Sequence, residues 1–162
     1  MKKTLFYGSI KTTFLILFAV ILLAGCKKDE MEEPASLIKK ATITLSGANE
    51  VPAVSTPGTG TAEIAYDPTM KMITYKITWQ FGSLAATTTN MHFHGSDTGS
   101  DMVNSPPVIP LTGFATSSGG TLSGMTVALT SAQEAQLLAG KWYLNLHSST
   151  FPGGELRGNI KL

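Results

Sequence analysis

Apolar and polar side chains alternate in short runs from residue 41 to the end of the chain. In the clearest run, 72–81, every second side chain is apolar, which places these side chains on one side of an extended strand. A similar run covers 142–147 and resumes over 155–162 after a Pro-Gly-Gly turn, which predicts a hairpin. Period-two alternation of this length is typical of strands and not of helices.

Shorter alternating runs lie between these segments, separated by loops rich in glycine, proline and serine. They predict further strands at 41–47, 60–66, 88–94, 108–115 and 122–129. Ser131 and Glu134 have the spacing of a capping box and Gly140 is a typical helix end, so a short helix is predicted near 131–139. We therefore predict an all-β fold, an antiparallel β-sandwich or barrel of about eight strands with Greek-key, immunoglobulin-like or superoxide-dismutase-like topology.

Composition limits the classes of function. The chain has 162 residues, of which 43% are hydrophobic, and a formal net charge of +1, so it has room for one domain and no strong basic charge that would favour nucleic acid as a partner. Trp79 and Trp142 are each in phase with aliphatic neighbours, and we expect both in the core. The single cysteine, Cys26, excludes an intrachain disulfide.

The N-terminal segment is typical of an exported protein. Lys2 and Lys3 precede an apolar run over 12–24, which has the length of a signal peptide and is short for a membrane span. The run ends in Leu-Ala-Gly-Cys26, which resembles the bacterial lipobox. This resemblance implies that residues 1–25 are removed and that Cys26 carries the lipid that anchors the protein to a membrane. The alternative is an uncleaved signal anchor.

A charged segment follows this cysteine directly. Residues 27–33 contain two lysines and four acidic side chains. We interpret 26–40 as the lipidated cysteine with a flexible tether and 41–162 as the folded domain. The charged segment is common in solvated linkers, but it also resembles the export signal of Bacteroidetes lipoproteins. That resemblance implies a lipid anchor in the outer membrane with the domain at the cell surface, and a periplasm-facing domain is the alternative.

All three histidines fall on the polar side of their predicted strands. His92 and His94 are two positions apart, and His147 lies in the strand of the C-terminal hairpin. If these strands are neighbours, the three imidazoles approach the spacing of an open zinc or copper site with three protein ligands and one free position. Asn145 and Glu155 are candidate partners that orient the rings.

Two alternatives to a metal site remain at this stage. In the first, the imidazoles hydrogen-bond backbone and carboxylate groups and fix the loops at Gly95 and Gly153-Gly154. In the second, they carry out acid–base chemistry, although the sequence has no recognisable nucleophile or carboxylate pair beside them. A His-x-His strand also holds copper in copper/zinc superoxide dismutases, but this chain has too few histidines for two metals and no cysteine pair. Dismutase activity is therefore not expected.

A further polar cluster is predicted around the hairpin. Glu155 and Arg157 lie two positions apart on one side of the last strand, where an ion pair across the sheet is the simplest interpretation. Glu50, in an Asn-Glu-Val-Pro loop, is expected to cap this cluster, and Asn145 completes it.

Three sequence blocks stand in a specific order. They are Leu45-Ser-Gly-Ala-Asn-Glu-Val-Pro52, then His92-Phe-His-Gly95 with Pro-Pro-Val after it, and then Tyr143-Leu-Asn-Leu-His147 with the block Pro152-Gly-Gly-Glu-Leu-Arg-Gly158. Together these blocks resemble the CHRD domain, named from chordin and also found in bacterial secreted and surface proteins, over residues 41–162.

The resemblance implies an extracytoplasmic β-domain, and in chordin it implies binding of growth factors. We therefore expect a lipid-anchored surface protein whose domain is a binding or structural module for an extracellular protein or glycan, with no cofactor required. The competing hypothesis is a metal-binding protein or metal-dependent enzyme that uses His92, His94 and His147.

Overall fold

The structure is a computed structural model that describes residues 37–96 and 102–162. The predicted signal peptide, the lipidated Cys26 and most of the predicted tether lie outside these residues. Within the described part of the chain, no helix is both long enough and apolar enough to cross a membrane.

Eight strands and one α-helix follow one another along this domain. They are β1 (Lys39–Ser46), β2 (Thr59–Asp67), β3 (Met72–Gln80), β4 (Thr88–Gly95), β5 (Pro107–Pro110), β6 (Gly119–Met125), α1 (Ser131–Leu138), β7 (Trp142–Ser148) and β8 (Leu156–Ile160), with a short 3₁₀ helix, η1 (Gly47–Asn49), after β1. The strands form one antiparallel sheet in the order β5-β4-β7-β8-β1-β2-β3-β6.

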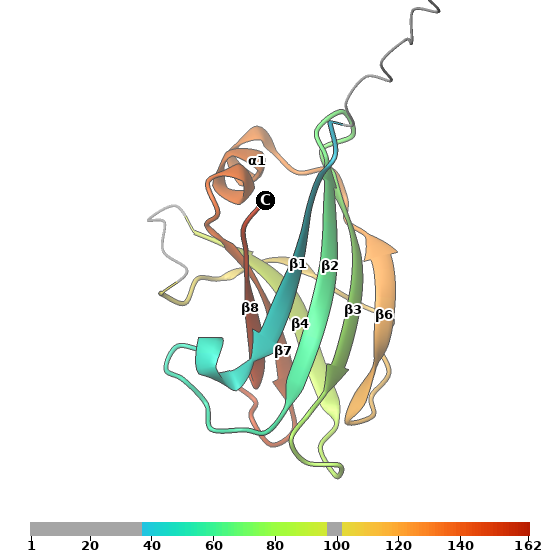
Figure 1. Ribbon diagram of the computed structural model, residues 1–162, viewed down its shortest axis with the longest axis vertical. Helices are drawn as coiled ribbons and strands as arrows, with labels where there is room; N and C mark the ends of the chain where they lie inside the picture. The colour runs from blue at the N-terminus through green and yellow to red at the C-terminus, as the bar shows by residue number, and fades with distance from the viewer. Residues whose placement is uncertain (1–36, 97–101) are drawn as a thin grey trace, which may run out of the picture. The chain divides into compact units, whose positions relative to one another are not determined.

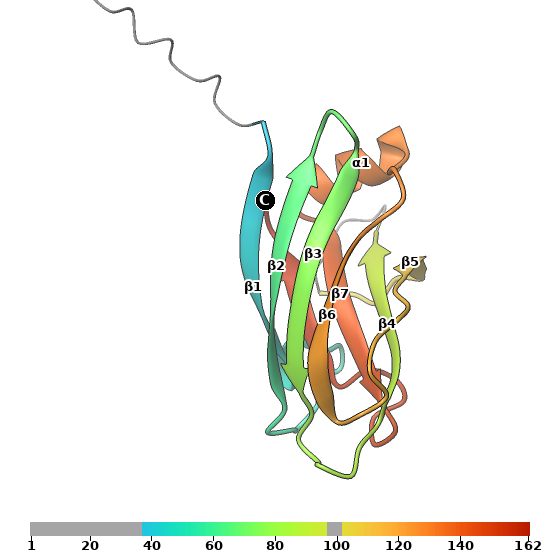
Figure 2. The ribbon, with the colours of Figure 1, turned by 90° about the vertical axis from the view of Figure 1, so that its right-hand side faces the viewer.

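This sheet folds over on itself into a half-barrel. Figure 1 shows β1, β2, β3 and β6 side by side in front of β8, β7 and β4, and Figure 2 shows the same two layers from the side. The joint between the layers is narrow, because β1 and β8 are paired only at Ser46 and Arg157. The predicted all-β antiparallel fold with one short helix is confirmed.

The hydrophobic core fills the space between the two layers. Every second side chain of β3 is buried there, and the apolar side chains of β4 and β7 face it from the other layer. Trp79 and Trp142, both predicted core residues, are 3% and 0% exposed. Alternation therefore sets which side of each strand faces inward.

The ends of two strands differ from the predictions. β5 ends at Pro110 and β6 at Met125, although the apolar pattern continues in both cases. Leu111 and Leu129 are still buried, because each packs from a loop whose N–H donates to a neighbouring strand or turn. The alternating pattern therefore continues past the end of each strand, because apolar loop residues also close the ends of the core.

The helix begins one position away from the predicted capping box. Thr130 is the N-cap and Gln133 is its reciprocal partner, so the predicted pair of Ser131 and Glu134 is wrong. Glu134 instead accepts a hydrogen bond from Tyr66 Oη (2.7 Å) and pairs with Lys71 (2.8 Å). The predicted end is confirmed, because Gly140 adopts φ +68° directly after the helix.

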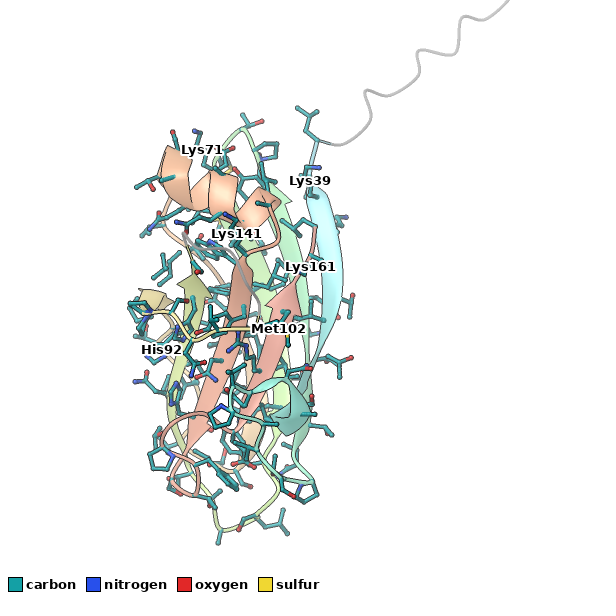
Figure 3. The ribbon with its side chains drawn as sticks, turned by 90° about the vertical axis from the view of Figure 1, so that its left-hand side faces the viewer. Lys39, Lys71, His92, Met102, Lys141 and Lys161 are labelled. Carbon is teal, nitrogen blue, oxygen red and sulfur yellow. The ribbon has the colours of Figure 1, made fainter. Side chains whose placement is uncertain are left out.

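The outer sides of the two layers differ in exposure. On β2 and β3 the outward side chains alternate with buried ones, whereas nearly every residue of β7 and β8 is buried on both sides. The polar side of the hairpin is therefore covered by other parts of the chain. Figure 3 shows the segment at Met102 crossing in front of this layer. It is held there because Asn104 accepts a hydrogen bond from Arg157 and the Ser105 N–H donates one to Tyr143.

Candidate metal centre

Strand pairing brings the three histidines together. In the β4–β7 pair, His94 lies opposite Tyr143, His92 opposite Asn145, and Asn90 opposite His147. His92 and His94 point to the same side because they are two positions apart, and His147 is the diagonal neighbour of His92 on the next strand. The ring centroid of His92 lies 5.5 Å from that of His94 and 5.2 Å from that of His147.

One ring nitrogen of each histidine converges with the other two. These three nitrogen atoms all lie within 4.8 Å of one another. One nitrogen in each ring is also buried and has no hydrogen-bond partner: Nδ1 of His92, and Nε2 of His94 and of His147. Lone pairs on neutral imidazoles in such an arrangement are the donors that zinc and copper prefer.

Backbone carbonyls fix the protonation of two of the rings. His94 Nδ1 lies 2.7 Å from the carbonyl oxygen of Ser105, and His147 Nδ1 lies 2.7 Å from that of Pro152. Because a carbonyl oxygen only accepts hydrogen bonds, Nδ1 carries a proton in both rings, and in the neutral form of each ring the lone pair is on Nε2. Metal-binding histidines commonly donate their second ring N–H in this way.

Burial keeps two of the imidazoles neutral. Burial lowers the pKa of His94 to about 4. The hydrogen bond to Ser105 raises this pKa, whereas the neighbouring histidines and Arg157 lower it further. Burial is also the main cause of the lowered pKa of His92, and His147 adds to it. The neutral ring is the form that binds a metal, so the environment of these rings favours metal binding near pH 7.

A stack of rings and one cation supports His94 from the side. Its imidazole lies parallel to the Tyr143 ring, with centroids 4.4 Å apart and an interplanar angle of 8°. The Arg157 guanidinium carbon lies 3.4 Å from the centroid of the same tyrosine ring. Arg157 is fully buried and donates to Asn104 Oδ1 (3.0 Å) and to the Val103 carbonyl oxygen (3.1 Å). The stack thereby joins the covering segment to the strands.

A buried carboxyl group lies in the same cavity. Glu50 is 7% exposed, and its Oε1 accepts a hydrogen bond from Asn145 Nδ2. Burial raises the pKa of Glu50 to about 7, while Arg157 and the bond from Asn145 act in the opposite direction. The cavity has a volume of about 240 Å³. Its lining consists of Glu50, His92, His94, Asn104, Ser105, Pro107, Tyr143, Asn145, His147 and Gly153.

The structure groups most of the residues that the sequence singled out. The three histidines, Glu50 and Asn145 line one cavity, and Arg157 lies over Tyr143, which lines it too. Glu155 points elsewhere, because its Oε1 accepts hydrogen bonds from Thr56 Oγ1 (2.7 Å) and the Gly82 N–H (2.9 Å). The ring N–H groups of His94 and His147 are held by backbone carbonyls, not by Glu155 or Asn145.

Sequence reasoning missed the residues that cover and support the rings. Tyr143 shares the polar side of its strand with Asn145 and His147, so its phase was a usable signal. Asn104 and Ser105 lie in a segment without periodicity, where no pattern indicates that their polar groups reach the strands.

A family model for the CHRD domain matches residues 41–160, which include all three histidines, Tyr143 and Arg157. The chain belongs to the CHRD domain family. The predicted resemblance is thus confirmed, and the CHRD domain is a β-type extracellular module. Searches of curated proteins and of solved structures gave no significant match.

Proposed function

We propose that this protein is an extracytoplasmic metal-binding protein whose CHRD domain holds one zinc or copper ion between His92, His94 and His147. The observation that supports this proposal is the convergence of one nitrogen from each ring within 4.8 Å, together with one buried nitrogen in each ring that has no partner. Imidazole suits both metals, so the ligand set alone does not choose between them.

A purely structural role explains the site less well. Hydrogen bonds from the rings to backbone carbonyls account for Nδ1 of His94 and of His147, but they leave the opposite nitrogens buried and unsatisfied. Each unsatisfied buried acceptor costs about 1–3 kcal/mol. A bound metal ion would satisfy three such nitrogens at once, and water in the cavity would do so only through weaker hydrogen bonds.

The arrangement leaves room for a fourth ligand. Three protein ligands beside open space are typical of zinc sites that keep one position for water or a small molecule. The cavity beside the rings is polar and contains the Glu50 carboxyl group. We therefore propose a site that binds a small ligand on its metal, in place of a closed site that only stabilises the fold.

Dialysis of the purified mature chain against Zn²⁺ or Cu²⁺, followed by elemental analysis, tests this proposal. We expect one metal ion per chain in the parent protein and in Asn90→Ala, which alters an exposed residue of the same strand and side. His147→Ala should retain none. A metal present at 100 times its dissociation constant should stabilise the parent by about 2.7 kcal/mol. Absence of retained metal together with an unchanged melting temperature would overturn the proposal.

The location of the protein is a separate part of the proposal. We propose that it is a Bacteroidetes-type lipoprotein, anchored in the outer membrane through Cys26 with its domain at the cell surface. The lipobox-like sequence before Cys26 and the charged segment after it support this assignment. Labelled fatty acid should enter the parent but not Cys26→Ala, and protease added to intact cells should digest the anchored domain. Protection of the domain until the outer membrane is opened would favour the periplasm-facing alternative.

A further inference from the structure

Positive charge gathers at one end of the domain. Of the six lysines in the described residues, five lie there, and we call this region the basic end; its lysines are Lys39, Lys40, Lys71, Lys141 and Lys161. Figure 3 shows four of them near the end where β1 begins and α1 lies. Among the described residues, only two acidic side chains, Asp67 and Glu134, accompany them, so side chains there carry a net charge of +3.

Contacts among distant segments confirm that these lysines share one end. Lys39 pairs with Tyr66, close to the β2–β3 turn that contains Lys71. Lys71 Nζ lies 2.8 Å from Glu134 on α1, and Lys161 Nζ donates to the Gly140 carbonyl oxygen (2.6 Å) just after this helix. The start of β1, the β2–β3 turn, α1 and the chain after β8 therefore form one continuous surface.

Large apolar side chains are exposed on the same segments. Leu37 is 71% exposed and Met70 50%, while Val127, in the connection to α1, is 72% exposed. Ile38 and Leu138 are also exposed. Exposed apolar side chains among lysines are the combination by which proteins bind the interface of an anionic bilayer, since apolar groups insert and cations pair with phosphates.

We infer that the basic end is a docking surface for a bilayer rich in anionic phosphate headgroups. Leu37, the first described residue, lies at this end. This inference rests on the proposed lipid anchor only for the identity of the membrane. If Cys26 is lipidated, residues 27–36 connect it to Leu37. These eleven steps along the chain span at most about 40 Å, so the anchor keeps the basic end close to the bilayer. The connecting segment is acidic overall and cannot itself supply this attraction.

Docking in this orientation leaves the metal cavity accessible. Figure 3 shows His92 near the middle of the strands, away from the end at which Lys39 and Lys71 lie. The cavity is lined by side chains from β4 and β7 and their covering segments, and none of the five lysines of the basic end is among them. The membrane would therefore hold the domain without covering its site.

Vesicle sedimentation tests this inference without the lipid anchor. The probe is the mature chain with Cys26→Ala, mixed with phosphatidylcholine vesicles that contain or lack 30% phosphatidylglycerol. We expect binding only to the anionic vesicles at 50 mM salt and loss of binding at 500 mM salt, because salt screens the lysines. Lys39→Gln with Lys40→Gln should weaken binding by more than about 10-fold, since each lysine near an anionic surface contributes about 5-fold.

Lys76→Gln is the matched control, because Lys76 is an exposed lysine in the middle of β3, opposite Glu63. It should bind like the parent. Equal loss in this control, equal binding to neutral vesicles, or no binding to anionic vesicles would overturn the inference. Since this chain carries no acyl group, none of these results depends on whether the proposed lipidation occurs.

Discussion

The two outer sides of the folded sheet both carry polar side chains, but they differ in exposure. On β1, β2, β3 and β6 a row of four threonines runs straight across the strands and stays exposed; the row is Thr44, Thr61, Thr78 and Thr121. On β4, β7 and β8 many outward residues are also polar, but five of them lie under loops and are buried; these are His92, His94, Tyr143, Asn145 and Arg157.

Buried polar groups need hydrogen-bond partners within the protein, whereas exposed polar groups do not. An exposed threonine is satisfied by water, so the open side needs no specific partners. A covered polar group must find a partner in the protein, and most groups on the covered side do so through the Asn104, Ser105 and Glu50 segments. The ring nitrogens that still lack partners are the atoms that the proposed metal ion would bind.

The largest effect is expected from removing the buried cation of the covered side. Arg157→Ala leaves the Asn104 and Val103 acceptors without this donor and removes the charge that favours ionised Glu50, so we expect a loss of about 4 kcal/mol in the free energy of unfolding. Lys76→Ala, on the open side, should change it by less than about 0.5 kcal/mol. Denaturant titration measures both, and equal effects would remove the distinction between the sides.

Metal affinity should separate the two sides next. His94→Ala removes one of three ligands, and we expect the dissociation constant for Zn²⁺ to rise more than about 100-fold, which is about 2.7 kcal/mol. Thr61→Ala, on the open side, should leave it unchanged. Calorimetric titration with Zn²⁺ gives both values. Retention of parental affinity by His94→Ala would show that the metal binds elsewhere.

A pair of glycine substitutions tests how tightly the turn between β7 and β8 packs against Glu50 and Asn145. Gly154 has φ +126°, and a Cβ added there would lie 2.5 Å from Asn145 Nδ2 and 2.8 Å from Glu50 Oε1. Gly113 has φ +82° but no neighbour within 4 Å. Both alanine variants carry backbone strain, so strain alone does not distinguish them. Only the added methyl group at position 154 meets close neighbours, and Gly154→Ala should therefore be less stable than Gly113→Ala by about 2 kcal/mol. Equal thermal stabilities would indicate that the loop yields freely.

The smallest effect concerns the pH dependence of stability. Burial raises the pKa of Glu50 from 4.5 to about 7, so the folded protein binds more protons than the unfolded chain between these values. This contribution is present below pH 4.5 and is lost as pH rises through 7. The lowered pKa of His94 acts in the opposite direction between 6.5 and about 4, so the parent alone does not isolate either group.

Glu50→Gln isolates the carboxyl contribution. Glutamine keeps an oxygen that accepts from Asn145 but does not ionise. Relative to the parent, the free energy of unfolding of this variant should rise by about 1.7 kcal/mol between about pH 4.5 and about pH 8. This is half of the about 3.4 kcal/mol that corresponds to the full pKa shift, because the cavity admits water. Metal-free protein and denaturant titration at several pH values give this difference. A constant difference across the range would contradict the buried, proton-binding state of Glu50.

Much of the fold could be predicted from the sequence, because alternation decides which side of a strand faces the core. The cap of α1 could not, since Thr130 and Ser131 are both good N-caps and each has a suitable partner three residues later. The strand ends could not either, because Leu111 is buried from a loop and continues the strand pattern.

The candidate site was predictable in part for the same reason. Phase placed His92, His94 and His147 on polar strand sides, but it carried no information about the loops that cover them. Asn104 reaches Arg157 across 53 positions, and Glu50 meets Asn145 across 95. Such contacts depend on the path of irregular segments, which have no periodicity to reveal it.

Anomalous diffraction from crystals grown with Zn²⁺ tests the central claim most directly. We predict one strong peak between the three imidazoles, about 2.0–2.1 Å from one nitrogen of each ring. The peak should be absent from crystals of His147→Ala grown in the same way. Imidazoles that keep their positions with no peak between them would contradict the claim that this covered side is a metal centre.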